Sequence, residues 1–200
     1  MPKILILGIL LMFCGLMFGI TLPYLLPPFP TDIEFLATKQ DVINIDYWKY
    51  AFYLHISSSF IVLVSGLFQF SKTLMFRFPK VHRNIGKLYV ALILFVSAPT
   101  GFIMAIHANG GNIAISAFVL QAILWWTFTF LAYTNIRQGK IRNHGKWMFR
   151  SYAMTLSAIT LRSISFMVGL LGIYIPYATL YRISAWSSWG LNLIIVEILM

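Results

Sequence analysis

The sequence predicts an all-α protein, a polytopic transmembrane helix bundle of about six spans with both termini in the cytoplasm. Three observations predict this fold class. First, 60% of the 200 residues are hydrophobic and only 10% are charged, whereas a soluble domain typically has about a quarter of its residues charged. Second, the chain contains several apolar runs long enough to cross a membrane. Third, the basic residues gather between those runs.

The apolar runs are the predicted spans, because a membrane-crossing helix needs roughly 20 mostly apolar residues. They cover residues 4–22, 47–70, 85–107, 113–136, 148–171 and 183–200, so residues 1–200 are predicted to form a single integral membrane domain. We expect the first span to be retained, since no small-residue cleavage site for a signal peptide follows it. The last predicted span is short and contains the polar residues Asn192 and Glu197.

The longest predicted loop, residues 23–46, joins the first two spans. Four prolines preclude a continuous helix through its first part. The pattern Thr31-x-x-Glu34 is typical of a capping box, and it predicts a short helix whose apolar residues rest on the bilayer surface. On the same side of the membrane, residues 108–112 (Ala-Asn-Gly-Gly-Asn) predict a tight turn between the third and fourth spans.

The distribution of charge predicts the orientation. Eleven of the 15 Lys and Arg residues are Lys3 or lie in segments 72–87 and 137–150, whereas four of the five acidic residues lie in loop 23–46. Because basic loops face the cytoplasm, both termini and both basic segments are expected there. The net charge of +10 is therefore expected to meet anionic lipid headgroups rather than nucleic acid.

Several motifs together resemble a known family. They are His55 with Ser57-Ser58-Ser59, the run Gly66-Leu67-Phe68-Gln69-Phe70, His82-Arg83-x-x-Gly86-Lys87-x-Tyr89, Ala108-Asn109-Gly110-Gly111, and His144-x-x-Trp147-Met148-x-Arg150-Ser151-Tyr152-Ala153 continuing to Thr160-Leu161-Arg162. From about Tyr53 to Arg162 the chain resembles the bacterial predicted membrane proteins grouped as domain of unknown function 2306. The resemblance implies a multi-span helical fold in a bacterial cytoplasmic (inner) membrane, and it implies no established reaction.

The predicted site is a layer of polar residues inside the membrane. Small and polar residues recur at helical spacing along the fifth span, which points that face into the bundle. This face carries Arg162, on the order of 9 Å below the outer boundary of the bilayer, and we expect it to have interior partners. His55, Thr100, Gln121 and Asn192, each on a different span, lie at roughly 10 to 14 Å on the same count. Pro99 and Gly101 are expected to kink the third span beside Thr100.

An intramembrane ionisable residue indicates function by default. The sequence therefore predicts binding of a redox cofactor, b-type haem or a quinone, by this outer-half polar layer. Arg162 supplies a fixed positive charge, and His55 supplies a nitrogen that ligates haem iron or accepts a proton. Three alternatives stay open: a hydrogen-bonded layer that fixes helix register, a transporter of a small molecule or ion, and an accessory or scaffold protein. A P-loop, a His-Glu-x-x-His motif and metal-spaced cysteines are not found in the sequence, and whether the protein is an enzyme is left open.

A second and weaker candidate lies at the inner ends of the spans, where His82 and His144 precede apolar runs. One interpretation is a basic rim that binds lipid phosphates. The other pairs His82 with His144 and His55 with His107 as ligands of two haems, by analogy with other helical bundles. Near this rim, Arg150 or Lys146 is the expected partner of Glu197. The oligomeric state is left open.

Overall fold

The computed structural model describes the backbone of residues 2–200 and the side chains of residues 11–200. The described chain is helical and contains no strand, which confirms the all-α class. In order, the elements are α1 (Pro2–Leu25), α2 (Glu34–Ala37), α3 (Asp46–Gln69), α4 (Lys72–Arg77), α5 (Pro79–Leu92), the π-helix η1 (Ile93–Ser97), α6 (Ala98–Ala105), α7 (Asn112–Arg137), α8 (Ile141–Leu170) and α9 (Tyr177–Leu199).

Four helices are long and apolar enough to cross a membrane. They are α3, the continuous helix formed by α5, η1 and α6 (Pro79–Ala105), α7 and α8. Within α1, the segment Leu11–Leu25 is a shorter apolar helix, and α9 is not among the four. These helices agree with a multi-span membrane protein.

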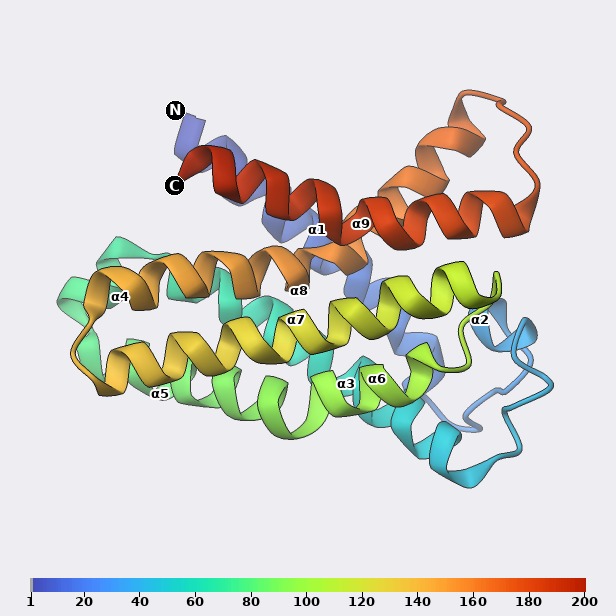
Figure 1. Ribbon diagram of the computed structural model, residues 1–200, viewed down its shortest axis with the longest axis horizontal. Coiled ribbons are helices and arrows are strands. Elements are labelled where there is room, and N and C mark those ends of the chain that lie inside the picture. The colour runs from blue at the N-terminus through green and yellow to red at the C-terminus, as the bar shows by residue number, and fades with distance from the viewer. Residues whose placement is uncertain (1) are drawn as a thin grey trace.

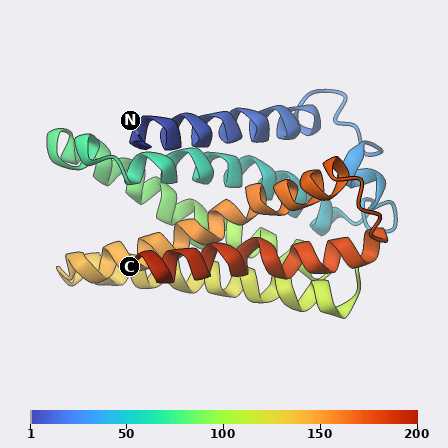
Figure 2. The ribbon, with the colours of Figure 1, turned by 90° about the horizontal axis from the view of Figure 1, so that it is seen from above.

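The long helices run along the length of the molecule, and its two ends differ (Figures 1 and 2). Helix α4, the turn between α7 and α8, and both chain ends lie at one end, which we call the basic end. Helix α2, the turn between α6 and α7, and the connection between α8 and α9 lie at the opposite, distal end (Figure 1). The two basic segments and both chain ends therefore share one end of the bundle.

Three helices begin earlier than their apolar runs predict. Helix α5 begins at Pro79, α8 at Ile141 and α9 at Tyr177, instead of at residues 85, 148 and 183. In α5 and α8 the added residues include Lys and Arg, which are good helix formers. More generally, and in α9 as well, a helix continues into the polar boundary of a membrane wherever its backbone hydrogen bonds are made. Much of each basic segment is thus the first part of a helix rather than a loop.

The expected capping box at Thr31 and Glu34 is wrong. Helix α2 begins at Glu34 itself, Ile33 occupies the N-cap position, and the cap has no side-chain hydrogen bond. Leu36, expected on the bilayer surface, is fully buried with Trp48 in a cluster that covers the distal part of α3. Packing against the protein removes these side chains from water as effectively as lipid does.

The main core lies nearer the basic end, where α3, α5, α7 and α8 meet around buried Tyr89, Ile93 and Tyr152. Gly66 on α3 permits the closest approach, because a Cβ atom there would lie 2.5 Å from Cε2 of Tyr152 and 2.8 Å from Cε2 of Tyr89. This tight packing fixes the helices that hold the residues of the distal half.

Candidate functional site

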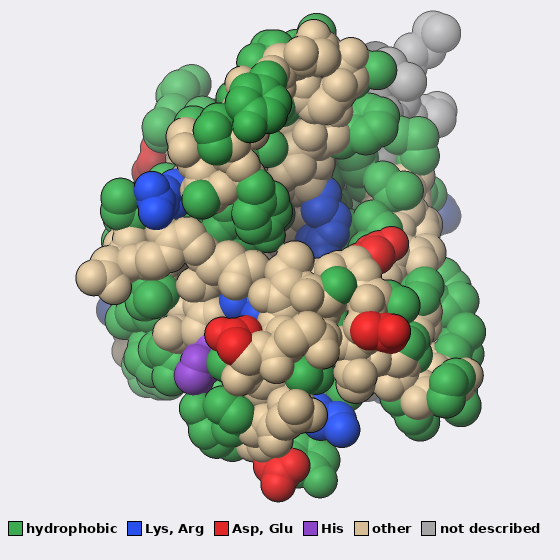
Figure 3. Space-filling view, turned by 90° about the vertical axis from the view of Figure 1, so that its right-hand side faces the viewer, with side chains coloured by type: hydrophobic (Ala, Val, Ile, Leu, Met, Phe, Trp, Pro, Cys, Tyr) green, Lys and Arg blue, Asp and Glu red, His purple; other side chains and the backbone are tan. Residues whose placement is uncertain are grey.

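A cavity of about 460 Å³ occupies the distal half of the bundle. Its walls come from α1, α2, α3, α6, α7, α8 and α9, and they are mostly apolar or aromatic. His55, Gln121 and Arg162 of the predicted layer line this one space, together with Glu34 of α2. The distal end of the molecule is hollowed, with a basic side chain on the floor of the hollow and acidic side chains at its rim (Figure 3).

His55 is held in one orientation by α6 and η1. Its Nδ1 lies 2.9 Å from the carbonyl oxygen of Ser97, and because a carbonyl only accepts, Nδ1 carries the proton. The ring lies directly above Gly101, where a Cβ atom would be 2.9 Å from Cε1 of His55. The remaining nitrogen, Nε2, has the Ser59 hydroxyl at 3.4 Å and is an acceptor in this tautomer.

The irregular helix beside His55 exposes the carbonyl groups that this arrangement uses. Pro99 has no N–H, and the π-helix η1 ends two residues before it, at Ser97, so regular backbone pairing is interrupted there. The carbonyl of Leu94 accepts a hydrogen bond from the Trp126 indole at 3.1 Å, and that of Ser97 accepts from His55. Thr100 does not line the cavity itself. Its hydroxyl donates to the Val96 carbonyl at 2.7 Å and lies 3.5 Å from Nδ1 of His55.

Arg162 faces the cavity from α8, and its side chain is exposed there. The expectation of interior partners is wrong within the described residues: its hydrogen bond goes to the Ala158 carbonyl of its own helix, at 3.0 Å. Glu34 and Tyr24 line the same cavity, and the Tyr24 hydroxyl lies 3.4 Å from Oε2 of Glu34. Among the described residues, the guanidinium group makes only the hydrogen bond to the Ala158 carbonyl, which leaves most of its donors available to a ligand.

Of the two remaining residues of the predicted layer, Gln121 lines the cavity and Asn192 does not. Gln121 donates to the Ser157 hydroxyl, while its Oε1 is buried without a partner in the described structure. Asn192 joins α9 to α8 by accepting from the Thr160 hydroxyl at 2.9 Å and donating to the Ala153 carbonyl at 3.0 Å. Asn192 therefore supports helix packing rather than the cavity.

Sequence reasoning missed a clamp at the distal end. Lys39, which is 2% exposed, donates from Nζ to the His107 carbonyl and to Oδ1 of Asn109. Burial lowers the pKa of the Lys39 ammonium group, and the Asp41 carboxylate partly offsets this effect. From the other side, Nε of Arg182 donates to the Gly110 carbonyl at 2.7 Å. In the sequence, Lys39 and Arg182 are isolated basic residues about 70 positions from the glycine-rich turn, and only the fold brings them to it.

Of the two histidine pairs considered from sequence, the structure brings His82 near His144 but does not bring His55 to His107. Nε2 of His107 lies 2.8 Å from the hydroxyl of Tyr47. Tyr47 lies about two helical turns before His55 on α3, so the His55–His107 pair is wrong. His82 and His144 lie near each other at the basic end, away from the cavity, and Nδ1 of His144 donates to the Ala132 carbonyl at 2.8 Å. In the described part of the chain, no three His, Cys, Asp or Glu side chains are grouped to hold a metal ion.

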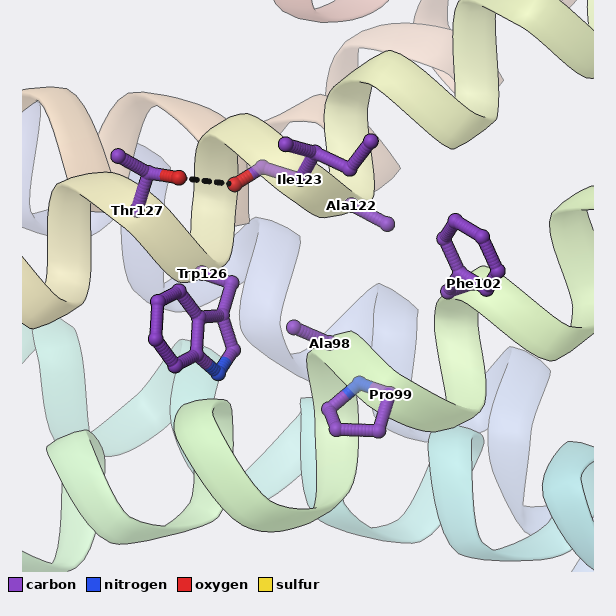
Figure 4. A pocket seen from close by; sticks show the side chains of 7 residues that line it. All are labelled: Ala98, Pro99, Phe102, Ala122, Ile123, Trp126 and Thr127. Carbon is purple, nitrogen blue, oxygen red and sulfur yellow. Dashed lines mark hydrogen bonds between the residues drawn. The ribbon is translucent and has the colours of Figure 1, made fainter.

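The expected partner of Glu197 is confirmed. Arg150 forms a two-point ion pair with it, at 2.5 and 2.8 Å, between α8 and α9. A smaller apolar groove of about 230 Å³ lies between α6 and α7, with Trp126 and Phe102 on either side of Ala98 and Pro99 (Figure 4). Its wall includes Ala122, which also lines the large cavity, so the two spaces are neighbours.

The chain was compared with known proteins. It matches no curated protein and no solved structure. The family described as "Predicted membrane protein (DUF2306)" matches residues 52–200, a range that includes the cavity residues His55, Gln121 and Arg162. Because this match covers well over half of the 200 residues, the chain belongs to the DUF2306 family of predicted membrane proteins.

Proposed function

We propose that the distal cavity binds a quinone as a redox cofactor. The observation that carries this proposal is the combination of an oriented imidazole and a largely unpaired guanidinium in one mostly apolar cavity. The Ser97 carbonyl fixes the His55 tautomer, so Nε2 accepts the hydroxyl proton of a quinol. The Arg162 guanidinium donates hydrogen bonds to the oxygen atoms of the bound ring.

The size and lining of the cavity suit an aromatic head group. About 460 Å³ falls within the range of roughly 300 to 1,000 Å³ that is typical of small-molecule sites. Phe60, Phe118 and Trp125 contribute aromatic surface to the wall, which favours stacking with a planar ring. A bis-histidine haem has less support, because His55 is the one histidine among the described cavity residues.

We further propose six spans with both termini in the cytoplasm of a bacterium and the distal end facing outward. The position of α4 and both chain ends at one end supports this orientation (Figure 1), as does the basic character of that end. In this arrangement His82, His144 and the neighbouring Lys and Arg residues of α5 and α8 lie at the inner membrane surface, where anionic lipid headgroups are their partners.

Purification in a mild detergent, followed by an absorption spectrum and solvent extraction, tests the function. We expect extractable quinone in the wild type, its loss in His55→Ala, and its retention in His107→Ala, since His107 lies outside the cavity wall. A Soret band would assign haem to this protein instead. Wild-type protein with neither a Soret band nor quinone would overturn the redox function.

A further inference from the structure

The cavity is bounded by two helices that do not pack on one another in the distal half. Helix α1 packs on α3, whereas α8 packs mainly on α7 and α9 and less extensively on α3. Both nonetheless supply cavity residues, Ile20 and Thr21 from α1, and Leu161, Arg162 and Ser165 from α8. A cavity wall shared by two unpacked helices has a seam between them.

The seam widens toward the distal end. On the cavity-facing side of α8, Met154 is 1% exposed and Thr155 is 6% exposed. Ala158 and Leu161 are half-buried, and Arg162 and Ser165 are exposed. The view in Figure 1 agrees, because the distal part of α8 turns away from α1 after the two helices cross. The space-filling view shows the hollow below this raised part (Figure 3).

The edges of the seam are apolar, whereas its floor is charged. Phe18 on α1 and Phe166 and Leu170 on α8 are exposed, and exposed apolar side chains on a membrane-spanning helix face lipid. Arg162 lies two turns, or about 12 Å, before the end of α8 at Leu170. A molecule that fills the seam therefore meets apolar walls first and a guanidinium group at the inner end.

We propose that the ligand of the cavity enters sideways from the membrane, between α1 and α8, and that its apolar tail stays in this seam. The proposal rests on the quinone-binding function above and adds a route and a requirement for the tail. The head group reaches Arg162 and His55, while the tail covers the exposed apolar edges that neither helix buries.

Cross-linking across the seam tests the route. The pair Phe18→Cys and Phe166→Cys, at seam edges that are exposed and lie outside the cavity wall, is placed in a Cys14→Ala background and joined by a bifunctional thiol reagent in phosphatidylcholine–phosphatidylglycerol vesicles. A matched pair, Phe70→Cys and Phe149→Cys, whose native rings lie 4.8 Å apart at the basic end, is joined by the same reagent as the control. Transfer of a long-tailed isoprenoid quinone from the vesicles, and binding of its tail-less head-group analogue, are then measured.

We expect the seam cross-link to slow uptake of the long-tailed quinone by about tenfold or more and to leave binding of the tail-less analogue within about twofold. The control cross-link should change neither. Equal loss or equal retention of the two ligands in the seam-linked protein would overturn the lateral route. Failure of the underlying function has a different result, because the unlinked protein would then bind neither quinone.

Discussion

The two halves of the bundle place their polar side chains in different surroundings. Toward the basic end, the Tyr89 hydroxyl lies 2.9 Å from that of Ser151 and 3.1 Å from that of Thr155. The Thr129 hydroxyl lies 2.7 Å from that of Ser151, and Tyr89, Ser151 and Thr129 are all fully buried. In the distal half, Arg162 and Glu34 are exposed to a cavity.

This difference distinguishes polar side chains that stabilise the fold from polar side chains that are available to bind a ligand. Each hydrogen bond in the buried network contributes about 1 kcal/mol, and an orphaned partner there costs more, so the network specifies one packing of α5, α7 and α8. A charged group left facing a cavity in the membrane contributes little to stability, and it is available to a ligand. The predictions below test whether the two halves respond to mutation in these two ways.

The largest expected effect is on stability in the basic half. Gly66→Ala places a Cβ atom 2.5 Å from Cε2 of Tyr152, and we expect a loss of about 3 kcal/mol in the free energy of unfolding, because neither aromatic ring has room to move. Gly190→Ala is the matched control, since no atom lies within 4 Å of the added carbon. Thermal unfolding in detergent measures both. Equal melting temperatures for the two variants would contradict the tight packing.

A comparison of two arginines gives the next largest effect. Arg182→Leu removes the hydrogen bond to the Gly110 carbonyl, and we expect it to cost about 2 kcal/mol of stability. Arg162→Leu should change the melting temperature little and should remove ligand binding, since Arg162 bonds to a carbonyl of its own helix. The same thermal assay, paired with quinone extraction, measures both properties. If Arg162→Leu lost more stability than Arg182→Leu, Arg162 would stabilise the fold rather than bind a ligand.

A smaller effect is expected on the position of His55. Gly101→Ala puts a Cβ atom 2.9 Å from Cε1 of His55 and should push the ring off the Ser97 carbonyl. We expect quinone affinity to fall by about tenfold, equivalent to about 1.4 kcal/mol. Gly145→Ala on α8, which has open space around the added carbon, should leave affinity unchanged. If both variants bind equally well, the orientation of His55 has no part in binding.

The last prediction has no expected effect on stability and tests which end faces outward. In a Cys14→Ala background, Asp41→Cys and Asn112→Cys at exposed distal positions should react with an impermeant thiol reagent on intact cells. Arg77→Cys and Gln138→Cys at the basic end should react after lysis only. Lys39 is unsuitable as a reporter, because it is buried. The reverse labelling pattern would exchange the outer and inner assignments of the two halves.

The sequence by itself predicted the helical class, the approximate apolar segments and the family. These follow from composition and from the length of apolar runs, which are properties of the chain that need no knowledge of its folding. It also predicted that His55, Gln121 and Arg162 lie at a similar depth, because helical rise converts residue number into distance along a helix. The same conversion of residue number into depth predicted that Arg150 or Lys146 pairs with Glu197, and the structure shows the Arg150 pair.

Only the tertiary structure decided which of these residues share a space. Depth along a helix does not fix the direction in which a side chain faces a neighbouring helix, so Asn192 was grouped with residues that it does not join. Arg162 was expected to be enclosed, but the divergence of α8 from α1 leaves it exposed to the cavity. The clamp by Lys39 and the seam beside Arg162 depend on contacts between segments far apart in sequence. Such contacts arise from how the helices pack, and no local pattern encodes them.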